Sequence, residues 1–399
     1  MAIGEEELGD LARALISELA AFDRPSASTG ELRAAQLIAQ RLKDDHCDVA
    51  IDEEKAHGTY WWPLGLLTLA SGLAALTRSR LLQIAAGAFS AAAVADDISG
   101  GSQWFRRAAL RQRSTWNVVA ETGDEDAAQT IVFVAHHDAA HWSLLFAPQI
   151  PEFLGERFPA QLERSQTTPA VMFPVIAGPL LTLLGGLSGS KLLRRAAATL
   201  SLGSALTFAE IGSRSVVPGA NDNLSGVAVL AGLARLLREQ PVDGVRVLLV
   251  STGSEESFME GMRGFAKRYF ASLPVATTKF VCIDSVGSPT LMQLEGEGML
   301  RMEDYDERFK AQLSDAAAQL DVELIRGLRF RNATDALISL QAGYPTLMLG
   351  SISRFKAPSN YHWPTDTAEN VDYSSVVDAT LICERLLRNE AATTAKAKG

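Results

Sequence analysis

The chain has 399 residues, 47% of them hydrophobic and 21% charged, which is typical of a globular protein with ample core material. Its formal net charge of −10 and the absence of a basic stripe argue against a nucleic-acid-binding surface. Three widely spaced cysteines (Cys47, Cys282 and Cys383) suit neither a disulfide framework nor a C-x-x-C metal pair, so we expect buried or free thiols.

The chain is predicted to begin with two helices and a strand. Residues 5–21 and 30–43 have helical periodicity, and residues 47–53 alternate as a short strand does. The segment from Ser28 to Glu31 is a plausible start for the second helix. Because the N-terminal segment is acidic and amphipathic, with no basic start before an apolar core, we expect no secretory signal peptide.

Two charge-free, apolar runs follow, at residues 58–77 and 81–95, with Arg78 and Arg80 between them. Aromatic residues at one end and arginines at the other fit a helical hairpin that dips into a membrane. Neither run clearly reaches the roughly 20 apolar residues of a straight span, so a buried helix pair or a dimer surface stays open. We assign residues 59–105 to this first hairpin insertion.

A second insertion, residues 139–215, repeats the pattern of a long apolar run, a basic tip and a shorter apolar run. Residues 167–190 carry no charge and are the best transmembrane candidate in the chain. Lys191, Arg194 and Arg195 follow, and residues 196–209 are apolar again. If the protein is membrane-associated, we expect residues 59–96 and 167–210 to make the contact.

The remaining segments alternate between strands and helices. Strands are predicted at 116–121, 131–134, 245–250, 279–283, 322–330 and 345–349, and helices at 223–240, 307–319 and 374–387. This alternation predicts an α/β fold with a mixed, mainly parallel sheet flanked by helices and interrupted by the two apolar helical hairpins. The α/β domain would comprise residues 1–58, 114–138 and 216–390, with a disordered tail at 391–399.

Potential metal ligands follow three of the apolar strands: His136, Glu256 and Asp284. Asp222 stands before a predicted helix, where an aspartate alone is more typical of an N-cap, and His362 stands in a loop. Because ligands bind at the carboxyl ends of strands in open α/β sheets, we expect these groups to lie together. Nitrogen and oxygen ligands suit Zn²⁺, and five of them suffice for two metals that share a bridging carboxylate.

The doublet Glu255–Glu256 offers two adjacent carboxylates directly after a buried strand. One of them is expected to bind metal, and the other to act as the proton shuttle beside the attacking water. A solvated acidic pair at a helix start is the alternative, but the strand just upstream argues against a freely exposed position.

Five segments together resemble the signature blocks of metallopeptidase family 28, which includes aminopeptidase Y, glutamate carboxypeptidase and glutaminyl cyclase. The segments are His136–Asp138, Gly219–Asp222, Glu255–Glu256, Ile283–Gly287 and Tyr361–Thr367. The resemblance covers the N-terminal helices, roughly residues 114–138 and roughly 216–390, in the family's order. The two apolar insertions depart from ordinary soluble members of the family.

The resemblance implies a role for each matched residue. His136 and Asp284 would share one zinc, Glu256 and His362 would hold the other, and Asp222 would bridge the two. Glu255 would be the general base and acid, and Asp138 would orient His136. Thr334–Asp335 resembles the family's Ser-Asp-His segment, but Ala336 replaces the histidine, so Asp335 is read as supporting only.

These residues predict a co-catalytic dizinc exopeptidase with a peptide substrate, an aminopeptidase in which Glu255 assists a metal-bound hydroxide. The same ligands also suit Mn²⁺ or Co²⁺. The alternatives are another amide chemistry on this fold (carboxypeptidase, glutaminyl cyclase or deacylase) or a non-catalytic binding protein. We expect His137 and His141 to be packing or surface residues, and His46 and His57 to lie at the surface.

The location of the protein follows less directly from the sequence. The apolar hairpins favour membrane association, with a soluble cytoplasmic protein as the alternative and a homodimer as a further use of the apolar surface. If each hairpin returns, the active site and the N-terminus lie on the same side of the membrane. The basic tips would then face outward, against the usual preference for Lys and Arg inside.

Overall fold

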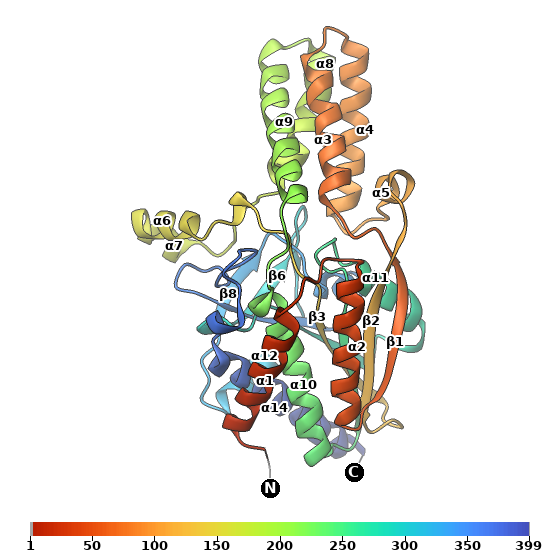
Figure 1. Cartoon of the computed structure of the whole chain (residues 1–399), viewed down its shortest axis with the longest axis vertical. Coiled ribbons are helices and arrows are strands. Elements are labelled where there is room, and N and C mark those ends of the chain that lie inside the picture. Colours follow the sequence, from red (N-terminus) through yellow and green to blue (C-terminus); the bar gives the residue numbers. More distant parts are fainter. Residues whose placement is uncertain (1–2, 399) are drawn as a thin grey trace.

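A nine-stranded sheet forms the centre of the computed structural model, which describes residues 3–398 (Figure 1). The strands run in the order β1-β2-β4-β3-β5-β9-β6-β7, and β8 pairs with β6. Their bounds are β1 (Asp48–Ala56), β2 (Arg113–Gly123), β3 (Gln129–His136), β4 (Val245–Thr252), β5 (Thr278–Ile283), β6 (Thr290–Glu297), β7 (Glu303–Asp304), β8 (Ile325–Phe330) and β9 (Thr346–Ile352).

The four central strands β4, β3, β5 and β9 are mutually parallel. Antiparallel pairs lie towards the edges, where β1 pairs with β2, β2 with β4, and β6 with β7 and β9. The predicted mixed, mainly parallel α/β sheet is therefore confirmed. Strands β6 and β7 were not predicted from the sequence.

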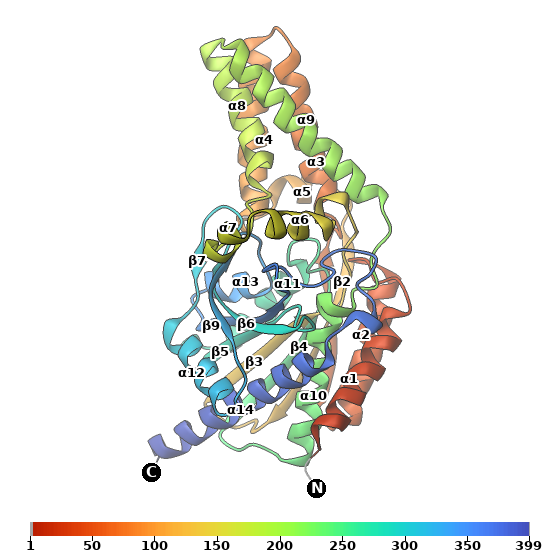
Figure 2. The same ribbon diagram turned by 90° about the vertical axis from the view of Figure 1, so that its left-hand side faces the viewer.

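Helices cover both faces of the sheet (Figure 2). Since side chains alternate along a strand, Ile131, Phe133 and Ala135 of β3 face one apolar core, and Val132 and Val134 face another. The first core packs against α1 (Glu5–Ala20), α2 (Thr29–Asp44), α10 (Ser225–Glu239), α12 (Glu307–Ala318) and α14 (Tyr373–Lys398). The second packs against α11 (Glu260–Tyr269) and α13 (Ala336–Gln341).

The C-terminal helix is longer than the sequence predicts. Helix α14 spans Tyr373–Lys398, whereas the prediction placed a helix at 374–387 and a disordered tail at 391–399. The helix therefore runs through most of the segment assigned to the tail. Residue 399 lies outside the described residues.

The two apolar hairpins pack together as one four-helix bundle that projects from the sheet domain (Figures 1 and 2). The first hairpin is α3 (Trp61–Leu76) and α4 (Arg80–Ile98), and the second is α8 (Phe173–Ser188) and α9 (Lys191–Ser213). Helix α3 packs on α9, and α4 packs on α8. The sequence predicted both hairpins, but not their association.

Shorter helices lie at the base of the bundle: α5 (Trp104–Ala109), α6 (Gln149–Arg157) and α7 (Pro159–Arg164). Of the described helices, α4 alone is long and apolar enough to cross a membrane by length and composition. Helix α8 has 16 residues, because it begins at Phe173 and not at residue 167. Residues 167–190 were the best transmembrane candidate in the sequence, but the helix that they form, α8, is shorter than α4.

Both insertions leave the sheet domain from the same edge. Strand β3 ends at His136, and β1, which runs parallel to β4 because each is antiparallel to β2, ends at Ala56. These are carboxyl ends of strands that point the same way. The topology therefore brings two hairpins that are far apart in the sequence to one end of the molecule.

Small residues line the interior of the bundle. A Cβ atom on Gly178 would lie 2.3 Å from Ser201 Oγ and 2.9 Å from Ser201 N, so α8 and α9 approach closely there. The hydroxyl of Ser71 on α3 donates to Thr182 Oγ1 on α8 over 2.9 Å. Helix-to-helix distance in the bundle thus depends on glycine and on short polar side chains.

We expect Gly178→Ala to lower the free energy of unfolding by about 1–3 kcal/mol, because the added methyl group has no room between α8 and α9. The matched control is Gly203→Ala in α9, where a Cβ meets nothing within 4 Å. That change should stabilise the helix by about 0.5–1 kcal/mol. Thermal unfolding monitored by circular dichroism measures both, and equal midpoints for the two variants would contradict the close packing.

Candidate metal centre

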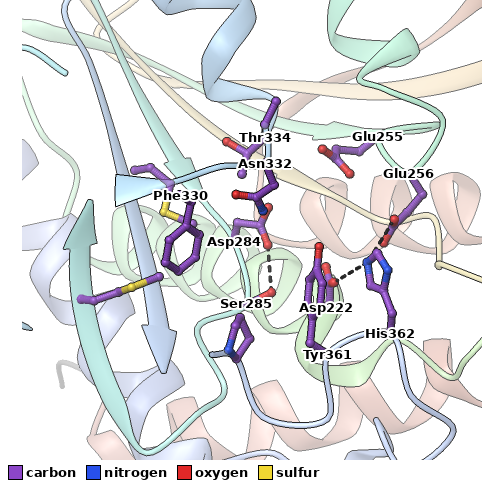
Figure 3. Close-up of a pocket in the computed structure, with 14 residues that line it drawn as sticks. Asp222, Glu255, Glu256, Asp284, Ser285, Phe330, Asn332, Thr334, Tyr361 and His362 are labelled. Atoms are coloured by element: carbon purple, nitrogen blue, oxygen red, sulfur yellow. Dashed lines mark hydrogen bonds and ion pairs between the residues drawn. The ribbon is translucent and has the colours of Figure 1, made fainter. Parts of the chain in front are cut away.

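Three of the predicted ligands lie side by side at the carboxyl edge of the sheet. His136 is the last residue of β3 and pairs in register with Thr252, the last residue of β4. Glu255 and Glu256 follow β4, and Asp284 follows β5, the other neighbour of β3. Figure 3 shows Glu255, Glu256 and Asp284 around one cavity.

Asp222 occupies the turn before α10. The backbone of Asp222 and Asn223 is non-helical, and α10 begins at Ser225, so Asp222 is not the N-cap that an aspartate at this position suggests. Instead, Asn223 Oδ1 accepts from the backbone N–H of Gly226 over 3.0 Å. The Asp222 carboxylate is therefore left to point into the cluster of ligands.

The two oxygens of Asp222 face two different histidines. Its Oδ1 lies 3.1 Å from His136 Nε2, and its Oδ2 lies 3.2 Å from His362 Nε2, which is also 3.2 Å from Glu256 Oε2. Ligand atoms of His136, Asp222 and Asp284 lie within 4.8 Å of one another, as do those of Asp222, Glu256 and His362. Two ligand triads that share one carboxylate are the arrangement expected for two bridged cations.

The electrostatics of the cluster also fit bound cations. Burial and the neighbouring Asp222 raise the pKa of Asp284 to about 7, and burial raises the pKa of Glu256. Among the described residues, Glu256 Oε1 and His362 Nδ1 are buried without a hydrogen-bond partner. Buried charges and unpaired polar atoms are costly unless something compensates them, and two divalent cations at the triads would do so.

Burial lowers the pKa of His362, but the carboxylates of Glu256 and Asp222 outweigh this effect and raise it to about 10. In the same way, Asp138 and Asp222 overcome burial and raise the pKa of His136 well above its usual value. Without metal, these carboxylates thus favour protonated histidines. Zinc requires neutral histidines, so binding would release protons.

Glu255 stands apart from the two triads that share Asp222. Its Oε2 lies 4.0 Å from His136 Nε2, and the side chain lines the cavity (Figure 3). Its ligand atom also lies within 4.8 Å of those of His136 and Glu256. Burial raises the pKa of Glu255 well above its usual value, His136 opposes this and Glu256 adds to it. A carboxylate that takes up a proton readily is suited to general base catalysis.

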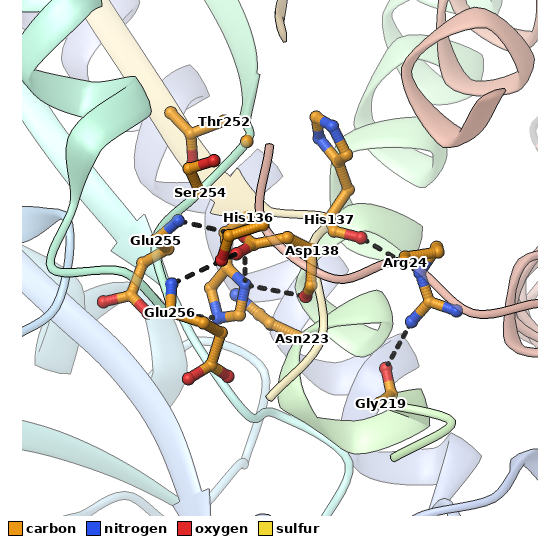
Figure 4. Close-up of polar contacts among 12 residues, drawn as sticks. Arg24, His136, His137, Asp138, Gly219, Asn223, Thr252, Ser254, Glu255 and Glu256 are labelled. Carbon is orange, nitrogen blue, oxygen red and sulfur yellow. Dashed lines mark hydrogen bonds and ion pairs between the residues drawn. The ribbon is translucent and has the colours of Figure 1, made fainter. Parts of the chain in front are cut away.

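Asp138 connects His136 to the Glu255–Glu256 segment (Figure 4). Its carboxylate accepts from the backbone N–H groups of Glu255 and Glu256 over 3.0 and 3.2 Å, and from Ser26 Oγ over 2.6 Å. The same carboxylate lies 3.4 Å from His136 Nδ1, which leaves Nε2 free to face Asp222. Asp138 therefore fixes a histidine and two glutamates relative to one another.

Asp366 holds the turn that contains Asp222, a role that the sequence analysis did not assign. Its two oxygens accept from the backbone N–H groups of Asn221 and Asp222, over 2.7 and 3.1 Å. Asp366 belongs to the Tyr361–Thr367 segment, so its place in that motif was the available signal. Burial raises its pKa to about 8.

Arg24 and Glu31 are two further buried residues that the sequence analysis did not connect with the site. Arg24 Nε donates to the carbonyl of His137 over 3.0 Å, and its Nη2 donates to that of Pro218 over 2.7 Å. Glu31 Oε2 accepts from Ser254 Oγ over 2.8 Å. Both side chains support ligand-bearing loops, Arg24 from the loop between α1 and α2 and Glu31 from the first turn of α2, and no local sequence signal marks them.

The remaining histidines lie outside the ligand cluster. His137 is buried, and its Nδ1 lies 2.9 Å from Ser251 Oγ, while half-buried His141 packs on Trp61. His46 is exposed, as expected. The expectation for His57 was wrong: it is buried, and its Nδ1 lies 2.8 Å from Glu260 Oε1, because the loop after β1 passes under the bundle.

The second insertion packs against the loop that carries His362. The ring of Phe146 meets the ring of His362 at a centroid distance of 4.7 Å, and Trp142 packs edge-on against Trp363 at 5.6 Å. On its other side, Tyr361 stacks on His362 at 4.0 Å. The insertion therefore restricts the movement of a ligand-bearing loop.

Two comparisons with known proteins agree with this geometry. Residues 206–387 match the model of Peptidase family M28. The fold resembles a glutaminyl cyclase from Bacteroides thetaiotaomicron (TM-score 0.58, 13% identity, 96% of this chain and 97% of that one). It also resembles an aminopeptidase from Aneurinibacillus sp. strain AM-1 (0.54, 14%, 95% and 93%) and a zinc aminopeptidase from Bacillus subtilis (0.54, 12%, 96% and 95%). No curated protein sequence matches the chain significantly.

We expect Asp138→Asn to weaken zinc binding about 10- to 100-fold, because the amide cannot accept from both glutamate N–H groups and support His136 as the carboxylate does. Competition with a chromophoric chelator measures the affinity. Ser26→Ala, which removes one hydrogen bond to the same carboxylate, is the control and should have a smaller effect. Unchanged affinity in Asp138→Asn would remove this positioning role.

Proposed function

Because residues 206–387 match the model of Peptidase family M28, we propose that the chain is a co-catalytic zinc exopeptidase that removes N-terminal residues from peptides. The observation that carries the proposal is the pair of ligand triads that share Asp222 beside a cavity that Glu255 lines. His136 and Asp284 would hold one zinc, Glu256 and His362 the other, and Asp222 both. Two such ions supply a nucleophilic water at neutral pH and polarise the scissile carbonyl.

Glu255 carries out the proton transfers in this proposal. Its carboxylate accepts the proton that the attacking water loses as the new C–O bond forms. The same proton then passes to the leaving amine as the C–N bond breaks, so Glu255 returns to its starting state. Its raised pKa supports this role, since the group must hold the proton between the two steps.

The lining of the cavity supports cleavage at the amino end. Glu255, Glu256 and Asp284 line it, and no lysine or arginine of the described residues does. In this proposal Glu256 and Asp284 bind the metals and Glu255 transfers protons, so the support comes from the missing cation, because a free α-carboxylate would require a cationic partner. Two cationic side chains line a neighbouring groove and are engaged elsewhere: Arg331 lies over the ring of Phe173, and Lys356 donates to the carbonyls of Glu163 and Ser165.

The apolar part of the lining supports a preference for an apolar N-terminal side chain. Met292, Phe330 and Met348 form this part, and all three are buried in the sheet domain. A charged substrate side chain would lose its hydration there without a partner.

The second candidate is another amide chemistry, and the fold resemblance to a glutaminyl cyclase favours it. Metal content separates the two. About two zinc ions per chain support the peptidase, and one zinc without peptidase activity supports a cyclase or deacylase. A chain that binds no metal would instead be a binding protein.

We expect Glu255→Gln to lower kcat/KM on aminoacyl anilides about 10²- to 10⁴-fold while the zinc content stays unchanged. The adjacent Glu256→Gln is the matched control, because it removes a carboxylate of a ligand triad and should lower zinc content as well. Elemental analysis and steady-state kinetics on the two purified variants test this difference. Full activity in Glu255→Gln would refute its assignment as the base.

We also expect metal removal to abolish hydrolysis. Dialysis against a chelator should inactivate the wild type, and added Zn²⁺ should restore it. Asp222→Asn should lose both zinc and activity without recovery, because Asp222 faces both histidines. Adding Mn²⁺ or Co²⁺ to the metal-free protein tests whether the site accepts them. Undiminished hydrolysis after complete metal removal would contradict the mechanism.

A further inference from the structure

The outer surface of the four-helix bundle is apolar on all four helices. Of the described large hydrophobic side chains that are exposed, all except Ile51 and Val275 lie between Trp62 and Leu206. On the bundle they include Leu69 of α3, Phe89 of α4, Leu180 and Leu184 of α8 and Leu206 of α9. Figures 1 and 2 show that the bundle stands clear of the sheet domain, so no part of residues 3–398 outside the bundle covers most of this surface.

The interior of the bundle consists of small and polar residues towards the tip, whereas Leu64, Phe208 and other large side chains fill it near the sheet domain. Ser71, Thr182 and Ser201 form a buried hydroxyl cluster, and glycines hold the helices close together. A Cβ on Gly87 of α4 would lie 2.4 Å from the backbone N of Leu183 on α8. A bundle in water buries its large apolar side chains, whereas helices in a membrane pack through small residues and expose the large ones to lipid.

Charge is restricted to the two ends of the bundle. Helices α3 and α8 carry none, and residues 81–95 of α4 and 196–209 of α9 are also uncharged. These segments have 14 to 16 residues, or about 21–24 Å of helix. Long basic side chains that extend from the tip make up the difference from a hydrocarbon core of about 30 Å.

The tip of the bundle is basic. Arg80 and Arg194 donate to carbonyls at the ends of the neighbouring helices, Gly186 of α8 and Thr77 after α3. Arg78, Lys191 and Arg195 form no hydrogen bond or ion pair with the described residues. Three free cations beyond an uncharged apolar segment complement a layer of anionic lipid headgroups.

Helix α6 adds an apolar face at the opposite end of the bundle. Ile150, Phe153 and Leu154, at i, i+3 and i+4 spacing, are 45%, 65% and 47% exposed. The helix lies at the level of the base, to one side of the bundle in Figure 1, and runs roughly perpendicular to the bundle axis in both views. This is the position of a helix that lies in a membrane interface.

We propose that the four-helix bundle crosses a lipid bilayer, with its basic tip in the far headgroup layer and the sheet domain at the near surface. A second copy of the chain is the weaker occupant, because a single contact would cover one side of the bundle, whereas the exposed apolar residues come from all four helices. The proposal goes beyond the proposed function and does not depend on it.

Thiol labelling tests the topology. The three native cysteines are buried, so Ser188→Cys near the tip and Ser272→Cys on the sheet domain each add one exposed thiol. The full chain is reconstituted in vesicles of phosphatidylethanolamine and phosphatidylglycerol and treated with a membrane-impermeant maleimide. In intact vesicles we expect the labelled fractions of the two variants to add up to about one, because the two thiols lie on opposite sides of the membrane. After detergent lysis both variants should be fully labelled. Full labelling of both in intact vesicles overturns the proposal.

Flotation with the same vesicles tests the lipid-facing surface. The wild type should float with the vesicles, and the double variant Leu69→Glu/Leu180→Glu should not, while Ile51→Glu, an exposed position on β1, should float as the wild type does. Circular dichroism shows whether each variant is folded. A wild type that stays in solution without detergent, as a monomer or as a dimer in light scattering, overturns the proposal. Anilide hydrolysis, measured separately, decides the proposed function whichever result is found.

Discussion

The structure depends on one constraint, the cost of burying several carboxylates at one edge of a sheet. Asp222, Glu256 and Asp284 are all less than one-tenth exposed and lie close to only two histidines. Two further buried carboxylates, Asp138 and Asp366, support the ligand-bearing segments, and backbone N–H groups stabilise both of them. The ligand carboxylates themselves have fewer such donors, so cations at the two triads would compensate their burial where hydrogen bonds do not.

The fold and the cluster of ligands could be predicted from sequence patterns because both follow from local rules. Each apolar run that ends in a polar residue predicted a strand and a side chain at its carboxyl end, and the parallel order of β4, β3 and β5 then brought His136, Glu256 and Asp284 together. The metal-binding role of each residue came from the family resemblance. The helix start at Ser225 did not follow from local rules, because Asp222 resembles an N-cap in sequence but faces two histidines in space.

Contacts that depend on tertiary packing were not predictable. Arg24 lies in the loop between α1 and α2, and Glu31 lies in the first turn of α2. Both are ordinary surface residue types, yet both are buried against loops more than one hundred residues away. His57 is also buried by tertiary packing, and it contacts the carboxylate of Glu260, the first residue of α11. The association of the two hairpins was also hidden, because α3 and α8 are apolar on every side and so show no periodic face that would identify a partner.

The bundle and the metal centre are consequences of the same topology. The first insertion begins after β1, and the second lies between Asp138 and Asp222, so both leave from the edge where the ligands gather. The bundle must therefore stand over that edge, and its base supplies Phe146 and Trp142 to the ligand loop around His362. In a sheet of this kind, ligands bind at the carboxyl edge, and the other surfaces contribute to stability. Insertions at that edge can thus change the surroundings of the site and the access of ligands to it. The core that positions the metal-ligating residues stays unchanged.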